Sequence, residues 1–248
     1  MAGLVASARA RQHGATVTVY EKGDRPGGSA LLSSGFVWRY REWETFRAQC
    51  PGGDPALQRL VWERLDEALR WLEGLGTPVR TRETGNELTK GLGFEPTGLV
   101  EALARRAGEI RLGEPLLRLP AGIPMVLATG GFQADCELVR RYVTPEADAL
   151  LLRSNPWSAG DGLRLGLEAG ASLSVGMDEF YGRNLAAVPQ IPPEDFVRLG
   201  QLYARYATVV NSRGETYESR TWSEVDVAQW TARQPGARAW YRVPRAVL

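Results

Sequence analysis

The chain has 248 residues, enough for one large domain or two smaller ones with a buried core. Its 30 basic and 29 acidic residues are interspersed, so the sequence offers no basic face for nucleic acid. Two distant cysteines, Cys50 and Cys136, and a single histidine, His13, speak against a zinc site and a disulfide framework. We find no apolar run near the ~20 residues of a membrane span and no signal peptide, and we expect a cytoplasmic protein without an integral membrane segment.

The first 40 residues predict a helix, a strand and a loop. Good helix formers fill residues 2–12, and Gly14 follows where a helix commonly ends. Residues 15–20 are β-branched and aromatic, as is typical of a strand. Residues 21–28 carry the glycines and proline of a loop, and residues 29–40 are mostly small and apolar.

A long amphipathic helix is predicted from Asp54 to Leu75. Asp54 is expected to cap it, and Pro55 suits the first helical position. Apolar residues recur at the 3/4 spacing of one buried face, namely Leu57, Leu60, Val61, Leu65, Ala68, Leu69 and Leu72.

Strands and helices then alternate, which predicts a parallel α/β sheet. Residues 77–95 are rich in turn formers. The expected helices cover 97–107, 135–142 and 160–169, and the expected strands cover 110–119, 123–131, 150–153 and 171–175.

After about residue 175 the pattern changes to that of a smaller α+β unit. We expect helices at 194–206 and 222–232, a hairpin at 208–217 and a strand at 237–243. The sequence therefore predicts one domain over 1–175 and a second over 176–248.

Residues 1–21 match the second half of a dinucleotide-binding unit. Gly3 stands like the third glycine of the Gly-x-Gly-x-x-Gly turn, where helix and sheet pack closely. Glu21 ends the second strand, where an acid binds the ribose hydroxyls. The first strand and the first two glycines of such a unit are missing from the sequence. An ordinary helix and strand that end in a surface glutamate would show the same pattern.

A second pair of glycines follows the acid. Gly27 and Gly28 allow the backbone to approach a diphosphate without Cβ clashes. The loop from Glu21 to Ser29 resembles that of two-dinucleotide-binding-domain flavoproteins, in which a glycine pair follows the ribose acid. Because a domain that binds only NAD does not need this pair, the resemblance favours FAD.

Three stretches together resemble the flavoprotein-subunit family of fumarate reductase and succinate dehydrogenase, which includes ketosteroid and tricarballylate dehydrogenases. They are residues 2–35, residues 126–133 (Val-Leu-Ala-Thr-Gly-Gly-Phe-Gln) and residues 157–171, which contain Gly160-Asp-Gly162. Taken singly, Ala-Thr-Gly-Gly is a common strand-end turn, and Asp161 could simply cap its helix. The order and spacing of the three stretches carry the resemblance.

The resemblance implies an α/β fold with a Rossmann-like FAD-binding domain, a parallel sheet with flanking helices, over 1–175 and a partial substrate or cap domain over 176–248. It also implies which residues contact FAD: Gly3, Glu21, Lys22, Gly27, Gly28, Ser29, Ser33, Ser34, Gly35, Ala128, Thr129, Gly130, Gly131, Asp161 and Gly162. Because the family's covalent form uses a histidine near the glycine pair and none occurs here, we expect non-covalent FAD.

The sequence departs from the family in three ways. The C-terminal segment that closes over the flavin is absent, and the segment before Val126 is short for the usual β-meander. The cap histidines of the fumarate reductases have no counterpart, because His13 lies at the end of the first predicted helix. A fumarate reductase mechanism therefore has no support among these residues.

The family transfers hydride between the flavin and a carbon–carbon bond next to a carbonyl or carboxylate. Candidate catalytic residues are Tyr181, as a proton or hydrogen-bond donor, and Arg183, as a carboxylate clamp, with Asp178 or Glu179 to orient them. A solvated turn with a packed tyrosine is the competing interpretation. Two further arginines, Arg205 and Arg220, have weaker claims.

Three functional hypotheses follow. The first is an FAD-dependent oxidoreductase whose small-molecule substrate is an organic acid or ketone and whose electron partner the sequence does not identify. The second is a truncated, non-catalytic remnant. The third is a nucleotide-binding module that a partner chain completes, since an unpaired sheet edge favours partner pairing.

Overall fold

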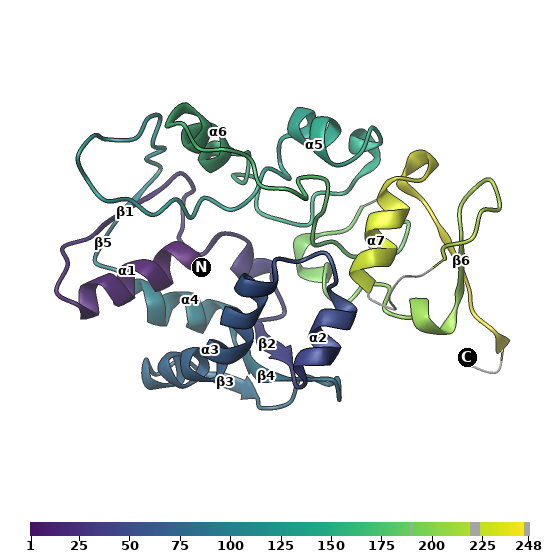
Figure 1. The fold of residues 1–248 in the computed structure, drawn as a ribbon, viewed down its shortest axis with the longest axis horizontal. Helices are drawn as coiled ribbons and strands as arrows, with labels where there is room; N and C mark the ends of the chain where they lie inside the picture. The colour runs from purple at the N-terminus through teal and green to yellow at the C-terminus, as the bar shows by residue number, and fades with distance from the viewer. Residues whose placement is uncertain (189, 219–223, 246–248) are drawn as a thin grey trace. The chain divides into compact units, whose positions relative to one another are not determined.

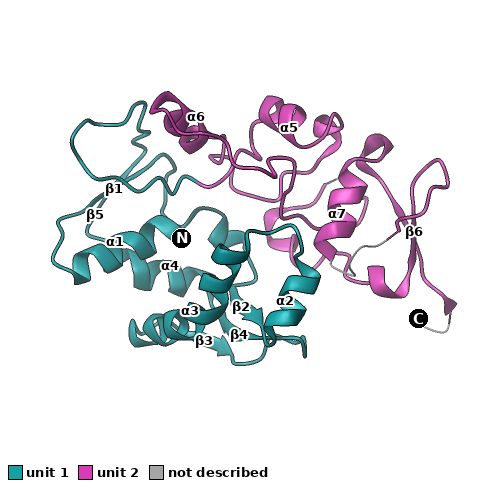
Figure 2. Cartoon of the chain, viewed as in Figure 1, with its two compact units in different colours: residues 1–129 teal, residues 130–248 magenta. Residues whose placement is uncertain are grey.

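The structure is a computed structural model that describes residues 1–188, 190–218 and 224–245 (Figure 1). The chain forms two compact units, residues 1–129 and residues 130–248 (Figure 2). The sequence placed a boundary near residue 175, between a part that binds the cofactor and a part that binds the substrate. This functional division stays a prediction.

The first unit begins with the expected helix and a parallel strand pair. Helix α1 (Ala2–Gln12) is followed by Gly14, which takes a left-handed conformation with φ +86°. Strand β1 (Thr18–Glu21) then pairs in parallel with β5 (Glu109–Leu112). Helix α4 (Pro96–Ala104) precedes β5 and lies beside α1 (Figure 1). These elements confirm a helix–strand unit with its parallel neighbour.

An antiparallel sheet lies in the region that the sequence predicted as turns. Its order is β2 (Phe36–Tyr40), β4 (Thr89–Phe94) and β3 (Val79–Thr81). The prediction of turns over residues 77–95 is therefore wrong. Glycine is a poor strand former, but Gly91 and Gly93 are needed here. A Cβ on Gly91 would collide with the backbone of β2, and a Cβ on Gly93 would collide with Thr81 of β3 and Phe36 of β2.

Helix α3 (Pro55–Gly74) begins as the sequence predicts. The Asp54 carboxylate accepts a hydrogen bond from the Leu57 backbone N–H at 2.9 Å, so the expected cap is confirmed. The short helix α2 (Trp43–Gln49) precedes it.

The buried face predicted for α3 holds only in its C-terminal half. Leu69 and Leu72 are buried, but Leu57 is 63% exposed and Leu60 and Val61 are half exposed. The first turns contact the protein through Trp62 instead, whose indole N–H donates to the Tyr40 carbonyl at 3.1 Å. The apolar core of this unit gathers α1, the C-terminal half of α3, β4 and α4 around fully buried Phe94 and Leu103.

The second unit contains three helices, several single 3-10 turns and one antiparallel strand pair within its described residues. The helices are α5 (Cys136–Tyr142), α6 (Asp161–Glu168) and α7 (Glu224–Ala232). The 3-10 turns of the chain are η1 (Gly28–Leu32), in the first unit, and η2 (Ala147–Ala149), η3 (Pro193–Asp195), η4 (Ala204–Tyr206) and η5 (Pro235–Ala237).

Strand β6 (Thr208–Val210) pairs with β7 (Trp240–Arg242), so the C-terminal strand is confirmed. The hairpin after β6 is confirmed by a bridge between Val210 and Thr216. Buried Ala204, Val209 and Val227 form the core beside this pair.

Three predicted strands are wrong. Residues 123–131, 150–153 and 171–175 form no strand in the described chain, and Val126 and Val175 are 68% and 98% exposed. Strands need a pairing partner, and their apolar runs alone do not supply one.

The helix predicted over 194–206 is also wrong. Its backbone instead bonds to the preceding segment, because the Gln201 N–H donates to the Asn184 carbonyl at 2.8 Å and Leu185 bridges Gly200. Only the turns η3 and η4 remain helical there.

Candidate nucleotide-binding and catalytic sites

The acid predicted to bind a ribose lies at the end of β1. Its Oε1 atom accepts a hydrogen bond from the Gly23 N–H at 2.8 Å, which holds the Glu21 side chain over its own loop. The Gly23 carbonyl accepts from the Gly113 N–H at 3.0 Å, so the loops that follow β1 and β5 meet. This is the carboxyl end of the parallel pair, where α/β folds bind ligands.

The N-terminus of α1 lies at the same place. The Met1 amino group lies 3.5 Å from the Gly27 carbonyl. Burial lowers the pKa of this amino group, and the nearby Glu21 carboxylate opposes that shift. No side chain caps α1, so its first N–H groups and partial positive charge are available to an anion.

The glycine pair adopts the backbone that the sequence predicts. Gly27 has φ +109°, and a Cβ there would lie 2.8 Å from a methyl group of Val100. Gly28, with φ +55°, is the first residue of η1. Ser29 follows it in the same turn, Lys22 lies in the loop before it, and both are partly buried.

Three further residues that were predicted to contact FAD form a turn that packs against β4. The Ser33 hydroxyl donates to the Ala30 carbonyl at 2.7 Å and accepts from the Gly35 N–H at 3.1 Å. The Ser34 carbonyl accepts from Arg80 at 2.7 Å. Gly35 has φ +74°, and a Cβ there would collide with the Phe94 carbonyl. These residues have a structural role, and their contact with a flavin stays a prediction.

The third glycine of the fingerprint packs as such a glycine should. A Cβ on Gly3 would lie 3.3 Å from the Ala128 Cβ, so α1 approaches closely the segment that ends in Thr129. The first and second stretches of the resemblance thus meet within the first unit.

The glycine turn and the start of α6 meet within the second unit. The Gly160 N–H donates to the Gly131 carbonyl at 3.1 Å. Gly130, with φ +78°, lies against buried Ser158, whose Oγ accepts from the Asn155 amide at 3.0 Å. The second and third stretches therefore come together, and their contact with a cofactor stays a prediction.

The cap of α6 is Gly160, in a left-handed conformation with φ +81°. Asp161 is the first helical residue, followed by Gly162, so the alternative in which Asp161 caps the helix is wrong.

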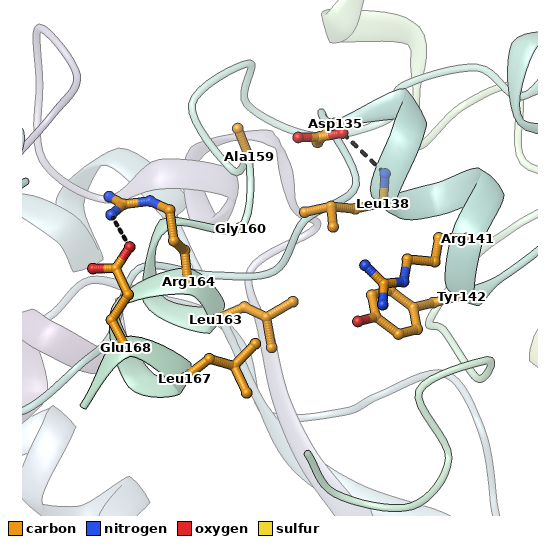
Figure 3. Close-up of a pocket in the computed structure, with 10 residues that line it drawn as sticks. All are labelled: Asp135, Leu138, Arg141, Tyr142, Ala159, Gly160, Leu163, Arg164, Leu167 and Glu168. Atoms are coloured by element: carbon orange, nitrogen blue, oxygen red, sulfur yellow. Dashed lines mark hydrogen bonds and ion pairs between the residues drawn. The ribbon is translucent and has the colours of Figure 1, made fainter. Parts of the chain in front are cut away.

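A cavity of about 360 Å³ lies between α5 and α6, and the sequence did not predict it. Leu138, Leu163 and Leu167 line it, and the Arg164–Glu168 ion pair, at 3.0 Å, lies at its edge (Figure 3). The only sequence signal for it was the apolar i, i+4 pair on α6.

The predicted catalytic pair is in direct contact. Arg183 donates from Nη2 to the Tyr181 hydroxyl at 2.8 Å, and its guanidinium carbon lies 4.6 Å from the centre of the Tyr181 ring. Asp178 instead faces Arg233, which donates to its carbonyl at 2.5 Å, and Glu179 is exposed. The described structure therefore gives Asp178 no role in orienting Arg183.

Sequence reasoning missed several charged and polar neighbours of this pair. Burial raises the pKa of the Glu224 carboxyl. The hydrogen bond from the Ala204 N–H and the charges of Arg183 and Arg205 act in the opposite direction and only partly offset this rise. Burial also raises the pKa of Tyr241 to about 12.

The Asn184 amide donates to the Tyr241 hydroxyl at 3.0 Å. Arg205 stacks on Tyr206 at 4.6 Å, and Arg220 lies outside the described residues. No local pattern could have found Glu224, which lies about 40 residues from Arg183 in the sequence.

Among the described residues, no three His, Cys, Asp or Glu side chains gather as metal ligands would. The helices described there are all too short or too polar to cross a membrane.

Known proteins are similar to this chain in sequence and in fold. Residues 1–34 match the family model of an NAD(P)-binding Rossmann-like domain. Over 112 residues the chain is 33% identical to the NADH:acrylate oxidoreductase of Vibrio harveyi. The matched region covers 40% of this chain and 11% of that protein.

The solved structure of a flavocytochrome c3 fumarate reductase in an open conformation is also similar, with a TM-score of 0.69 and 20% identity. It aligns with 97% of this chain and 50% of its own. The 3-ketosteroid-delta4-(5alpha)-dehydrogenase of Rhodococcus jostii RHA1 gives a TM-score of 0.72 at 16% identity, over 99% of this chain and 64% of that one. The chain has the fold of the fumarate reductase and ketosteroid dehydrogenase flavoproteins.

This finding confirms the resemblance and the Rossmann-like α/β fold class. A further neighbour with the fumarate reductase-like fold is the 3-ketosteroid delta1-dehydrogenase of Sterolibacterium denitrificans, with a TM-score of 0.61 and 17% identity over 93% of this chain and 64% of that one. The chain spans about a tenth of the curated relative and between half and two thirds of the solved structures that it matches.

Proposed function

We propose that the chain is part of an FAD-dependent oxidoreductase that transfers hydride between the flavin and a carbon–carbon bond next to a carbonyl or carboxylate. The observation that supports this most is the cluster at the end of β1, where Glu21, the start of α1 and Gly27 come together. The substrate would be a small organic acid or ketone.

The residues at this cluster fit a flavin nucleotide. Glu21 offers a carboxylate for ribose hydroxyls, and the N-terminus of α1 offers N–H groups for phosphate oxygens. Gly27 leaves the close backbone approach free of a side chain. Non-covalent binding is the mode that we propose.

Within the second unit, Gly130, Gly131, Asp161 and Gly162 would supply further contacts with the cofactor. When bound, FAD supplies the group that accepts or donates hydride. The chain then has to bind the substrate, orient it and move one proton.

Tyr181 and Arg183 are the residues that we propose for this work. The Tyr181 oxygen accepts from Arg183, which leaves the tyrosine proton directed elsewhere and available to a substrate oxygen. Arg183 keeps N–H groups beyond those that contact Tyr181 and the Gly182 carbonyl, and these can bind a carboxylate.

The test is a titration of FAD into the wild-type chain and a Glu21→Gln variant, followed by quenching of flavin fluorescence. We expect the variant to bind FAD about tenfold more weakly, because a charge-assisted hydrogen bond to the ribose is lost. The matched control is Glu63→Gln, on the exposed face of α3, which should bind like the wild type. Equal affinity in all three proteins would contradict the role of Glu21.

One observation favours the third hypothesis, a nucleotide-binding module that a partner chain completes. Residues 123–127 are apolar and exposed, and the described chain provides no strand that pairs with them. Size-exclusion chromatography with detection at flavin wavelengths separates the two functions. Flavin that elutes with the monomer supports the oxidoreductase, and flavin that elutes only with a co-purified partner supports the module.

A further inference from the structure

We infer that the free edge of β7 binds an extended acidic segment of another protein, which adds to the β6–β7 pair as a further strand. The inference rests on Arg238, Trp240 and Arg242, whose exposed side chains we call the arginine face. It concerns a partner surface and is independent of the proposed oxidoreductase activity.

Side chains alternate between two sides along residues 238–242. Arg238 has an extended backbone just before β7, with φ −123° and ψ 145°, so the alternation of a strand begins there. Ala239 and Tyr241 pack against the buried core beside the strand pair. Arg238, Trp240 and Arg242 alternate with them and are exposed, Trp240 to 50%. The strand therefore has an inner apolar side and an outer side on which two cations flank an aromatic ring.

The backbone of β7 has an unpaired edge in the described chain. Strand β6 lies between β7 and the returning arm of its hairpin, because the Tyr217 N–H donates to the Val209 carbonyl at 2.9 Å. Since Val209 faces Tyr241 in the β6–β7 register, the two form a non-hydrogen-bonded pair of that ladder. The Tyr241 N–H and C=O therefore point away from β6, and no described residue bonds to them. An edge of this kind accepts an added strand.

The arginine face has unpaired charge within the described residues. Neither Arg238 nor Arg242 forms an ion pair or a side-chain hydrogen bond there, and the Trp240 indole N–H has no acceptor. Other arginines of the same unit pair with carboxylates, namely Arg140, Arg164, Arg198 and Arg233. Arginine and tryptophan are enriched among the residues that dominate binding at protein interfaces. The charge and composition of the face therefore fit an acidic partner.

The spacing of the face defines the pattern of the partner strand. On a strand paired with β7, the residues opposite Arg238 and Arg242 lie four positions apart on one side, and the residue opposite Trp240 lies midway. Acidic residues at the two outer positions form cross-strand pairs of opposite charge, and an apolar residue between them covers the indole ring. The expected motif is acid-x-apolar-x-acid.

A second copy of this chain does not fit the same edge. Antiparallel pairing of two β7 strands around Trp240 would place Arg238 opposite Arg242 on both sides of the ring. Like charges directly opposite one another destabilise a strand pair. The arginines that attract an acidic segment thus also prevent the edge from joining to itself.

The experiment measures the fluorescence anisotropy of a labelled peptide, Thr-Glu-Thr-Val-Thr-Glu-Thr, titrated with the full chain. One comparison peptide has lysine in place of both glutamates. The other has a methyl group on the backbone nitrogens of the two threonines that flank valine, because these nitrogens face β7. We expect the acidic peptide to bind and each comparison peptide to bind about tenfold more weakly, since one loses the charge pairs and the other the main-chain hydrogen bonds. Added salt should weaken binding of the acidic peptide.

A double variant tests the arginine face itself. Arg238→Gln combined with Arg242→Gln should weaken binding of the acidic peptide about tenfold, because both charge pairs are lost. The matched control is Arg213→Gln, at an exposed arginine of the hairpin that lies across β6 from β7, and it should bind like the wild type. Thermal melting shows that each variant is folded.

Several results would overturn the inference. If the wild type does not bind the acidic peptide, the arginines only protect the edge from aggregation. Equal binding of either comparison peptide, or wild-type affinity in the folded double variant, would refute the charge pairs or the strand addition. Tighter binding of a single-stranded oligonucleotide would assign the face to nucleic acid. Wild-type dimers in size-exclusion chromatography that the double variant loses would assign it to a second copy.

Discussion

The Gly160 N–H donates to the Gly131 carbonyl at 3.1 Å, which joins two glycine turns that lie about 30 residues apart in the sequence. Buried Ser158 reinforces this joint, since its carbonyl accepts from the Ala134 N–H at 3.0 Å and its hydroxyl lies against Gly130. The start of α6 and the turn at residues 130–131 are thereby held as one element. We propose that this element presents backbone groups to the cofactor.

Ser158→Ala tests the contact between the turn at residues 130–131 and the start of α6. The change removes the acceptor of the Asn155 amide, and the loss of a buried hydrogen bond costs about 1–3 kcal/mol. Urea unfolding should show this loss. Ser154→Ala, a more accessible serine in the same loop, is the control and should cost less. An equal loss in both variants would show that Ser158 contributes no more to stability than the more accessible Ser154.

Gly27→Ala tests the strained turn beside Glu21. The left-handed backbone and the collision with Val100 should together cost about 2–4 kcal/mol of unfolding free energy. Gly85→Ala is the control, because Gly85 has φ +74° but no atom within 4 Å of a new Cβ. It should lose only about 1 kcal/mol. Thermal or urea unfolding compares the two, and a Gly27 variant as stable as the control would contradict the packing described.

Asp54→Ala tests the cap of α3. Loss of the bond to the Leu57 N–H should cost about 1 kcal/mol, and Asp54→Asn should recover most of it, since asparagine also caps helices well. Urea unfolding followed by circular dichroism measures both. If Asp54→Asn is as unstable as Asp54→Ala, the carboxylate acts through its charge and not as a cap.

Glu224→Gln tests the raised pKa of a half-buried carboxyl. A folded-state pKa above the unfolded value favours the protonated form in the fold, so this contribution is present at acid pH and is lost as pH rises through the folded pKa. Glutamine mimics the protonated form, and its Oε1 can still accept from the Ala204 N–H. The variant should therefore melt higher than the wild type at pH 7, and the difference should vanish as pH falls below the unfolded value of 4.5.

A lower melting temperature of Glu224→Gln at pH 7 would contradict this account. It would mean that attraction between Glu224 and the arginines Arg183 and Arg205 outweighs the cost of burial. Salt titration provides the check, because such attraction is screened.

Tyr181→Phe tests the proposed proton donor. Under the proposed function, we expect kcat with the organic-acid substrate to fall by about 100-fold and KM to change little. Arg183→Gln should instead raise KM, because it removes carboxylate binding. Tyr203→Phe, at another exposed tyrosine, is the control and should leave both constants unchanged. An unaltered kcat in Tyr181→Phe would assign the proton transfer elsewhere.

The sequence predicted those parts of the fold whose causes are local. Helices α1, α3 and α5 carry their own end signals in Gly14, Asp54 and Asp135. The left-handed turns at Gly27 and Gly130 need glycine for a backbone reason, so their motifs were visible before the structure.

The remaining elements depend on partners far away in the sequence. Strand β4 was missed because Gly91 and Gly93 hide its strand character, although the neighbouring strands β2 and β3 require them. The apolar run at 123–131 predicted a strand but does not pair within the described chain. Glu224 was missed as a charged neighbour of Arg183 because only tertiary structure brings the two together.

The most direct test of the central claim is the visible absorption spectrum of the purified chain after incubation with FAD and gel filtration. We predict that flavin bands stay with the protein and that acid or heat releases the flavin, because it is held without a covalent bond. A folded chain that elutes without flavin bands would contradict the claim that these residues bind FAD by themselves.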